Sequence, residues 1–173
     1  MKRGYHPPLT ITRRALLVGG SDTEFRRLIY RLIVVEERLR RARDFLARRI
    51  GLSGPQYTLL ITVAYLQGES GIAMRALARN LRVSSAFITA ESQRLIDRGL
   101  LAKRPNPHDS RSTLISVTAA GRRRLEKLVP ELRTINDQFF GHVNAQSFRH
   151  AMRFLEQLLA GSERVMAHMA RHA

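Results

Sequence analysis

One face of a helix expected over residues 84–98 carries side chains that suit contact with the bases of DNA. Only small or hydrogen-bonding residues occupy this face: Ser85, Ala86, Thr89, Ala90 and Gln93. In a major groove, an amide such as Gln93 can read adenine, hydroxyl groups are versatile, and alanines can meet thymine methyl groups. Ser84 is placed to cap the start of the helix. The alternative is a polar surface with no reading role.

Basic residues that suit phosphate contacts lie near the end of this helix and beyond it. They are Arg94, Arg98, Lys103 and Arg104. Arg111 follows a turn, with Asp109 two residues earlier. A carboxylate at that distance can hold the guanidinium, and an arginine held in this way can enter a minor groove. A solvated turn is the alternative for this pair.

The elements that would position these residues follow one another without a gap from residue 70 to residue 121. A short bracing helix with an apolar inner face precedes a turn that Val83 plugs. Two strands, Leu100–Arg104 and Ser112–Thr118, then flank the turn-forming segment Asn106–Ser110. This order predicts a helix-turn-helix followed by a two-stranded wing, an arrangement suited to reading duplex DNA.

Long helices are expected on both sides of this module. On the N-terminal side, an amphipathic helix over about 22–49 begins at a capping box, Ser21–Glu24. A second capping box, Ser53–Gln56, begins an apolar helix over about 55–67.

On the C-terminal side, one apolar stripe contains Pro130, which should kink or break its helix, and another predicts a helix over about 145–170. The middle module is too small to cover such helices at both ends. Burial against a second subunit is therefore favoured over an intramolecular core. The expected fold class is mainly α with a small β-wing (α+β).

Composition narrows the classes of function. The chain has 173 residues, no cysteine and a formal net charge of +16 that is spread along it. The charge favours a polyanionic partner, and the lack of cysteine excludes disulfides and thiol catalysis. There is no membrane-length apolar run, nucleophile motif or phosphate loop, and His168 with His172 makes too weak a set for a metal. We expect a cytoplasmic protein, not an enzyme, with no cofactor, no metal and no membrane partner.

From about Leu52 to Leu125 the sequence resembles MarR-family transcriptional regulators. Four stretches carry the resemblance, in matching order and spacing: LSGPQYTLL, ALARNLRVSSAFIT, LIDRGLLAKRPNPHDSRSTLISVT and AAGRRRLEKL. With the flanking helices, the resemblance extends over about residues 22–170. It implies a homodimer of winged lobes that binds a pseudo-palindromic operator in double-stranded DNA, with half-sites ~10 bp apart. It also implies Arg111 as the wing-tip arginine, with Asp109 as its partner.

One departure from the family pattern concerns the inner face of the second helix. Glu91 and Ser92 stand where aliphatic residues are usual. A buried Glu91 would need a partner, such as Arg82 or an arginine of another helix. We expect the chain to consist of four parts: a basic flexible arm (1–20), an N-terminal dimerisation helix (21–51), the winged helix-turn-helix lobe (52–121) and C-terminal dimerisation helices (122–173).

The resemblance further implies a repressor that a small molecule releases from DNA. The effector would be an aromatic acid or its coenzyme A thioester, wedged between the lobe and the dimerisation helices. Candidate ligand-binding residues are Arg26, Tyr30, Tyr57 and Ile61. The alternatives are tyrosines that pack a helix junction and arginines that are merely solvated. At the level of the whole protein, the alternative is a nonspecific architectural DNA-binding protein, because a charge of +16 alone gives sequence-independent affinity.

Overall fold

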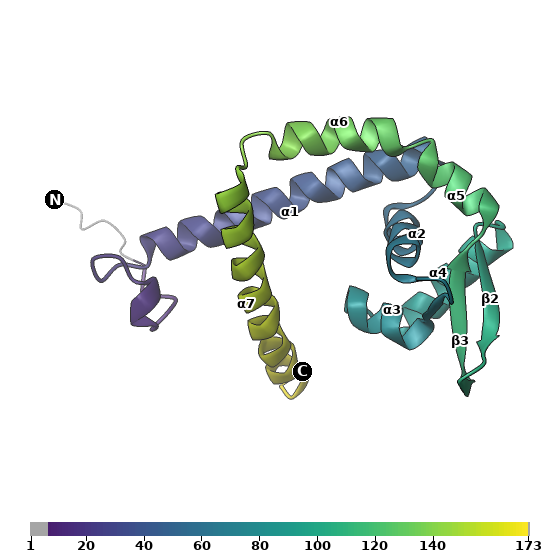
Figure 1. Cartoon of the computed structure of the whole chain (residues 1–173). Helices are drawn as coiled ribbons and strands as arrows, with labels where there is room; N and C mark the ends of the chain where they lie inside the picture. Colours follow the sequence, from purple (N-terminus) through teal and green to yellow (C-terminus); the bar gives the residue numbers. More distant parts are fainter. Residues whose placement is uncertain (1–6, 173) are drawn as a thin grey trace. The chain divides into compact units, whose positions relative to one another are not determined.

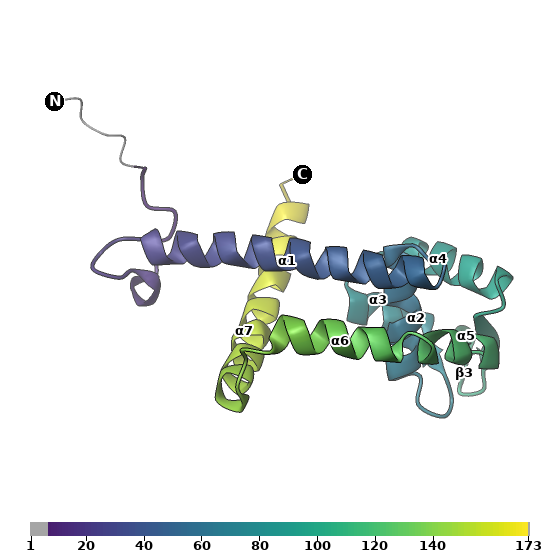
Figure 2. The same cartoon turned by 90° about the horizontal axis from the view of Figure 1, so that it is seen from above.

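The structure, a computed structural model, describes residues 7–172 and divides into two compact units between Val129 and Pro130. Figure 1 shows the elements in sequence colours, and Figure 2 shows the same elements from above. They are η1 (Arg14–Leu16), α1 (Thr23–Arg49), α2 (Gly54–Leu66), β1 (Ile72–Ala73), α3 (Met74–Leu81), α4 (Ser85–Asp97), β2 (Leu101–Asn106), β3 (Asp109–Val117), α5 (Ala119–Glu126), α6 (Val129–Phe140) and α7 (Ala145–Ala170). The predominance of helices with one small sheet confirms the predicted fold class.

The core of the winged lobe is built by α2, α3, α4 and the sheet. Fully buried apolar side chains come from each of these elements: Leu59, Leu60, Val63, Leu77, Ile88, Leu95, Leu101 and Ile115. α2 begins with the predicted capping box, in which Ser53 Oγ accepts the Gln56 N–H at 3.4 Å and Gln56 Oε1 accepts the Ser53 N–H at 3.3 Å. Because α2 buries apolar side chains on several sides, it supports the helix-turn-helix.

The sheet has β3 in the centre, with β1 and β2 antiparallel on either side. Both wing strands are longer than predicted, so the hairpin turns on Pro107 and His108 alone. Asn106 Oδ1 accepts the His108 N–H at 3.0 Å, and this bond closes the turn. The sequence did not predict β1, because a strand of two residues leaves no alternation to detect.

The turn between α3 and α4 closes through its backbone. Arg82 adopts a left-handed conformation with φ 54°, and the Val83 N–H bonds to Ala78 O at 3.1 Å. Val83 itself is 37% exposed, so the prediction that it plugs the turn was wrong. A left-handed residue after the last turn satisfies a free carbonyl, which ends α3 without a buried plug.

The start of α1 also differs from the prediction. Asp22 occupies the N-cap position, and no side chain caps the helix there. The Asp22 carboxylate accepts the backbone N–H and the hydroxyl of Thr10, both at 2.7 Å, and Arg26 Nε at 3.0 Å. Arg26 and then Thr10 hold the pKa of Asp22 well below its usual range. The carboxylate thus ties residues 7–20 to α1, whereas residues 1–6 of the predicted arm lie outside the described residues.

Asp22→Asn should release this segment from α1, because the neutral amide loses the charge that Arg26 binds. We expect trypsin to cut after Arg13 and Arg14 several-fold faster in the variant, as followed by mass spectrometry over a digestion time course. Glu24→Gln is the matched control, since its ion pair with Arg27 is exposed and contributes little. Equal cleavage of variant and control would contradict the anchoring role of Asp22.

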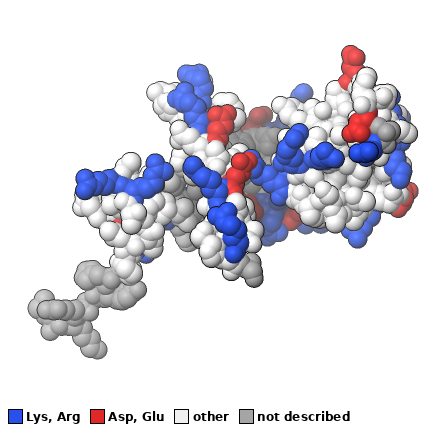
Figure 3. Space-filling view, turned by 90° about the horizontal axis from the view of Figure 1, so that it is seen from below, with Lys and Arg blue, Asp and Glu red and all other residues white. Residues whose placement is uncertain are grey.

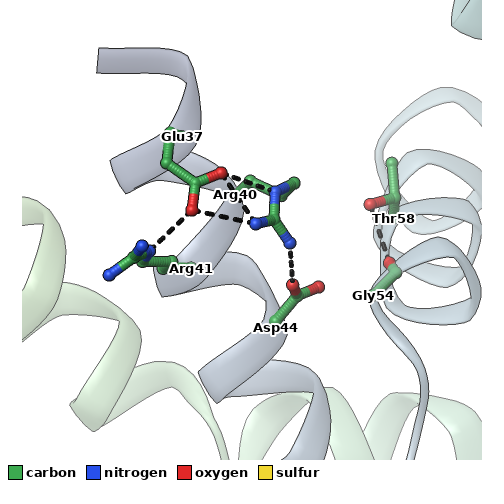
Figure 4. A network of polar contacts seen from close by, with 6 residues as sticks. All are labelled: Glu37, Arg40, Arg41, Asp44, Gly54 and Thr58. Atoms are coloured by element: carbon green, nitrogen blue, oxygen red, sulfur yellow. Dashed lines mark hydrogen bonds and ion pairs between the residues drawn. The ribbon is translucent and has the colours of Figure 1, made fainter. Parts of the chain in front are cut away.

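A network of ion pairs within α1 lies opposite the first turn of α2 (Figure 4). Glu37 binds both Arg40 and Arg41, and Arg40 Nη1 reaches Asp44 Oδ2 at 3.0 Å. The two guanidinium groups, Arg41 first, lower the pKa of Glu37, which keeps its carboxylate charged. Asp44 faces Gly54, where an added Cβ would lie 2.0 Å from Asp44 Oδ1. Glycine at this position lets α2 begin close to α1.

The second unit comprises Pro130 onward, with most of α6 and all of α7. α5 ends at Glu126 and α6 begins at Val129, so Pro130 lies in a first helical turn and the predicted break is confirmed. Exposed apolar side chains run along α7: Phe148, Met152, Leu155, Leu159, Val165, Met166 and Met169. In the described part of the chain, no helix is long and apolar enough to cross a membrane.

Candidate nucleic-acid interface

The face of α4 on which reading side chains were predicted is open to solvent. All five of its residues are exposed: Ser85, Ala86, Thr89, Ala90 and Gln93. The opposite face is buried in the lobe through Ile88, Ser92 and Leu95. Ser84 Oγ accepts the Phe87 N–H at 3.1 Å, which confirms the predicted cap. The lobe therefore holds α4 by one side and leaves the other free for a partner.

Gln93 is held by two neighbours on this exposed face. Its Nε2 donates to Asp97 Oδ1 at 2.7 Å, one helical turn away. Lys103 Nζ, on wing strand β2, donates to Gln93 Oε1 at 3.4 Å. The structure thus joins two predicted DNA-contacting residues, Gln93 and Lys103, directly, and Gln93 also binds Asp97, a residue that the sequence did not single out.

Glu91 is 8% exposed, although it stands at a position where aliphatic residues were expected. Its partner is Arg94, one turn along α4, rather than Arg82 or an arginine of another helix as predicted. Arg94 Nη1 donates to Glu91 Oε1, whereas Glu91 Oε2 and the buried Ser92 Oγ have no hydrogen-bond partner within the described residues. Arg94, predicted to contact phosphate, thus serves a buried carboxylate.

Two other arginines that were predicted to contact phosphate donate hydrogen bonds to backbone carbonyl groups instead. Arg98 Nη2 donates to Gly51 O at 2.7 Å, which links the end of α4 to the loop between α1 and α2. Arg104 Nη2 donates to Ser70 O at 2.8 Å, which links the wing to the loop before β1. Their contact with phosphate stays a prediction, and these bonds would compete with it.

At the wing tip, Asp109 acts on the backbone of Arg111. Asp109 Oδ1 accepts the Arg111 N–H at 3.1 Å. Asp109 was predicted to hold the guanidinium of Arg111, but it binds the Arg111 backbone instead. A short aspartate side chain reaches the backbone N–H two residues on more easily than a distant guanidinium. Both residues are exposed, and within the described contacts the Arg111 guanidinium is left to reach outward.

On the face that Figure 3 presents, surface charge does not single out one patch. Figure 3 shows Lys and Arg scattered over the face that it presents, with acidic side chains between them. This agrees with the even spread of basic residues along the sequence. The arrangement of α4 and the wing, more than charge density, marks the candidate interface.

The four residues predicted to bind a small molecule do not form one site. Arg26 and Tyr30 line an open apolar hollow of about 420 Å³ near the start of α1. Tyr57 is 4% exposed within the lobe, where burial raises the pKa of its hydroxyl, and Ile61 is half-buried on α2.

A second hollow, of about 430 Å³, opens between α1, α2 and the turn from α3 to α4. The sequence did not predict it, because its walls come from four elements with no local spacing in common. It is lined by Arg40, Arg43, Asp44, Gly54, Pro55, Thr58, Leu81, Val83 and Phe87. Within the described residues, no cluster of histidines and acids could hold a metal ion.

The order α3, α4 and β-hairpin, supported by α2 and flanked by long helices, defines a winged helix-turn-helix protein. Residues 50–112 match the model of the MarR family. A helix-turn-helix transcriptional regulator, YdgJ of Bacillus subtilis, is 29% identical over 90 residues, which cover 52% of this chain and 54% of YdgJ. The chain thus spans about half the length of that relative.

Two further comparisons cover more of the chain. The transcriptional activatory protein BadR of Rhodopseudomonas palustris is 26% identical over 140 residues, 80% of each chain. The crystal structure of CouR from Rhodococcus jostii, bound to p-coumaroyl-CoA, superposes with a TM-score of 0.68 over 76% of this chain and 90% of CouR, at 20% identity, a likeness of fold. The lobe thus matches the MarR family model over residues 50–112, and the fold around it resembles that of CouR.

Proposed function

We propose that the protein is a sequence-specific regulator of transcription that binds a pseudo-palindromic operator in double-stranded DNA. The observation that carries this proposal is the exposed outer face of α4, whose inner face is locked in the lobe, beside a hairpin that bears Arg111. A helix held in this way can enter a major groove while the wing reaches the adjacent minor groove. The match of residues 50–112 to the MarR family model and the similarity to the transcriptional activatory protein BadR support this function. We further propose that it acts as a repressor.

Equilibrium titrations at physiological salt test this function. The full chain should bind a pseudo-palindromic site, selected from random DNA, at least ~10³-fold more tightly than random duplex. Equal affinities would instead identify a nonspecific architectural DNA-binding protein, which the net charge of +16 favours as the alternative.

The proposed DNA-binding form is a homodimer. α1 and α7 carry long rows of exposed apolar side chains, such as Ile33 at 61% and Phe148 at 57% exposed. Contiguous apolar surface of this kind is typical of an interface, and a two-fold dimer matches a pseudo-palindromic site. Sedimentation equilibrium should give twice the mass of the chain, and a monomer at micromolar concentration would contradict the dimer.

We also propose that a small-molecule effector, such as an aromatic acid or its coenzyme A thioester, lowers the affinity for DNA. The hollow of about 430 Å³ has a size typical of ligand pockets and combines apolar walls with Arg43, which suits an anionic group. CouR is bound to a ligand of this class, p-coumaroyl-CoA. In a thermal-shift screen, an effector should stabilise the free protein and weaken operator binding. Stabilisation without loss of DNA affinity would argue against regulation.

Arg111→Ala should weaken operator binding about tenfold and flatten any preference for a narrow minor groove. Loss of one cationic contact should also reduce the salt dependence of the binding constant by about one unit of log–log slope. Fluorescence anisotropy at several salt concentrations measures both effects. Arg38→Ala, the same charge change on an exposed position of α1, is the control. If the two variants bind alike, the assignment of the wing tip is wrong.

A further inference from the structure

We infer that Asp97 and Lys103 are positioning residues, which fix the amide of Gln93 in the orientation that reads adenine. This inference rests on the proposed binding of DNA. The Gln93 amide is held from two different elements, α4 through Asp97 at 2.7 Å and wing strand β2 through Lys103 at 3.4 Å. The helix and the wing therefore share control of one side chain on the exposed face.

The chemistry of the two partners allows only one orientation of the amide. An ionised carboxylate can only accept hydrogen bonds, and an ammonium group can only donate them. If the amide were turned over, its NH₂ group would face Lys103 and its oxygen would face Asp97, so both contacts would become repulsive. The Nε2 end of Gln93 therefore points toward Asp97 and the Oε1 end toward the wing.

These two contacts leave Gln93 the capacity to read a base. A primary amide has two N–H donors and two acceptor lone pairs, so one of each remains. In the major groove, adenine presents one acceptor beside one donor, which is the complement of an amide, whereas guanine presents two acceptors. Because the ends of the amide cannot exchange, Gln93 is set for adenine on one strand and against thymine at the same position.

The acidic character of α4 supports this role for Asp97. Ser85–Asp97 carries two acids and one arginine, within a chain of net charge +16. A carboxylate near the phosphate backbone weakens binding to every sequence alike. Asp97 is exposed, so burial in the lobe does not explain it. Its contact with Gln93 gives this carboxylate a function in selectivity that offsets its general cost in affinity.

Selection of bound sites from a randomised duplex library by the purified full chain tests the inference. The wild-type protein should enrich adenine at one position of each half-site, and Gln93→Ala should abolish that enrichment while keeping the rest of the motif. Asp97→Asn should lower the preference for adenine roughly tenfold, since an amide at position 97 can donate as well as accept and lets Gln93 turn over. Lys103→Met tests the same orientation from the wing and should lower the preference by a smaller factor.

Glu126→Gln is the matched control for Asp97→Asn. It also removes one negative charge, at an exposed position at the end of α5. It should raise the affinity for all sequences alike and retain the preference for adenine. If Asp97→Asn and Lys103→Met both keep the wild-type preference, the inference is overturned. If the wild-type chain enriches no motif at all, the proposed function fails first, and the two failures are therefore distinguishable.

Discussion

Gly121→Ala should strongly destabilise the winged lobe. A Cβ at this position would lie 2.3 Å from Leu100 O and 2.7 Å from Val117 Cγ1. The carbonyl belongs to the backbone and accepts the Thr118 N–H at 3.1 Å, so it cannot rotate away. α5 would have to move off the sheet, and overpacking of this kind costs about 1–3 kcal/mol or more. The melting temperature should fall by about 5–15 °C, as measured by circular dichroism.

Gly161→Ala is the matched control for this prediction, because it adds the same methyl group to another helix. Nothing lies within 4 Å of a Cβ added at Gly161, in the interior of α7. Alanine is favoured over glycine inside a helix by about 0.5–1 kcal/mol. The same substitution should thus stabilise α7 and destabilise the lobe at Gly121. A similar fall in melting temperature for both variants would refute the steric argument.

Substituting the two members of the Glu91–Arg94 ion pair should change the stability of the protein in different ways. Arg94→Ala leaves a buried carboxylate with no charged partner, and an unpaired buried polar group costs about 1–3 kcal/mol, more if charged. Glu91→Leu removes the carboxylate, including the buried Oε2 that lacks a hydrogen bond within the described structure. Replacing a buried charge with an apolar side chain of similar volume is often neutral or stabilising.

Urea denaturation of both variants measures this asymmetry, and DNA titration gives an independent readout. In Glu91→Leu, Arg94 is released to the exposed face of α4, so affinity for all DNA should rise and the salt slope should steepen by about one unit. Arg79→Ala, which removes an exposed arginine from the last turn of α3, controls for the loss of one charge in Arg94→Ala. If Glu91→Leu destabilises the protein as much as Arg94→Ala, the pair stabilises the lobe in its own right.

Much of the fold could be predicted because its signals are local. Ser53 and Gln56 sit three residues apart in a capping box, and the period of apolar residues gave α4 and α7 to within about one residue. The capping box predicted at the start of α1 was wrong, because the Asp22 carboxylate binds Thr10, twelve residues earlier in the chain. No local sequence rule detects such a partner. β1 was not predicted, because a strand of two residues is too short to show a periodic pattern.

The sequence predicted which face of α4 is exposed, but it did not predict the hydrogen-bond partners of the side chains in the candidate site. The exposed side of α4 followed from helical spacing, since Ile88 and Leu95 had to turn inward. The partners of individual side chains did not follow, because Arg98 and Arg104 bind carbonyl groups that the fold brings in from distant loops. Long arginines in a strongly basic chain have many possible acceptors, and only the assembled backbone decides among them.

The contact of Asp44 with Gly54 has a mechanical consequence. It brings α2 of the winged lobe close to one end of α1, a helix of 27 residues that is about 40 Å long. In the proposed dimer, a tilt of α1 would therefore carry the lobe with it. A tilt of about 5° over that length shifts the far end by roughly 3.5 Å, comparable to the ~3.4 Å spacing of stacked bases along one strand. A rotation too small to disturb any core could therefore move α4 out of register with its half-site.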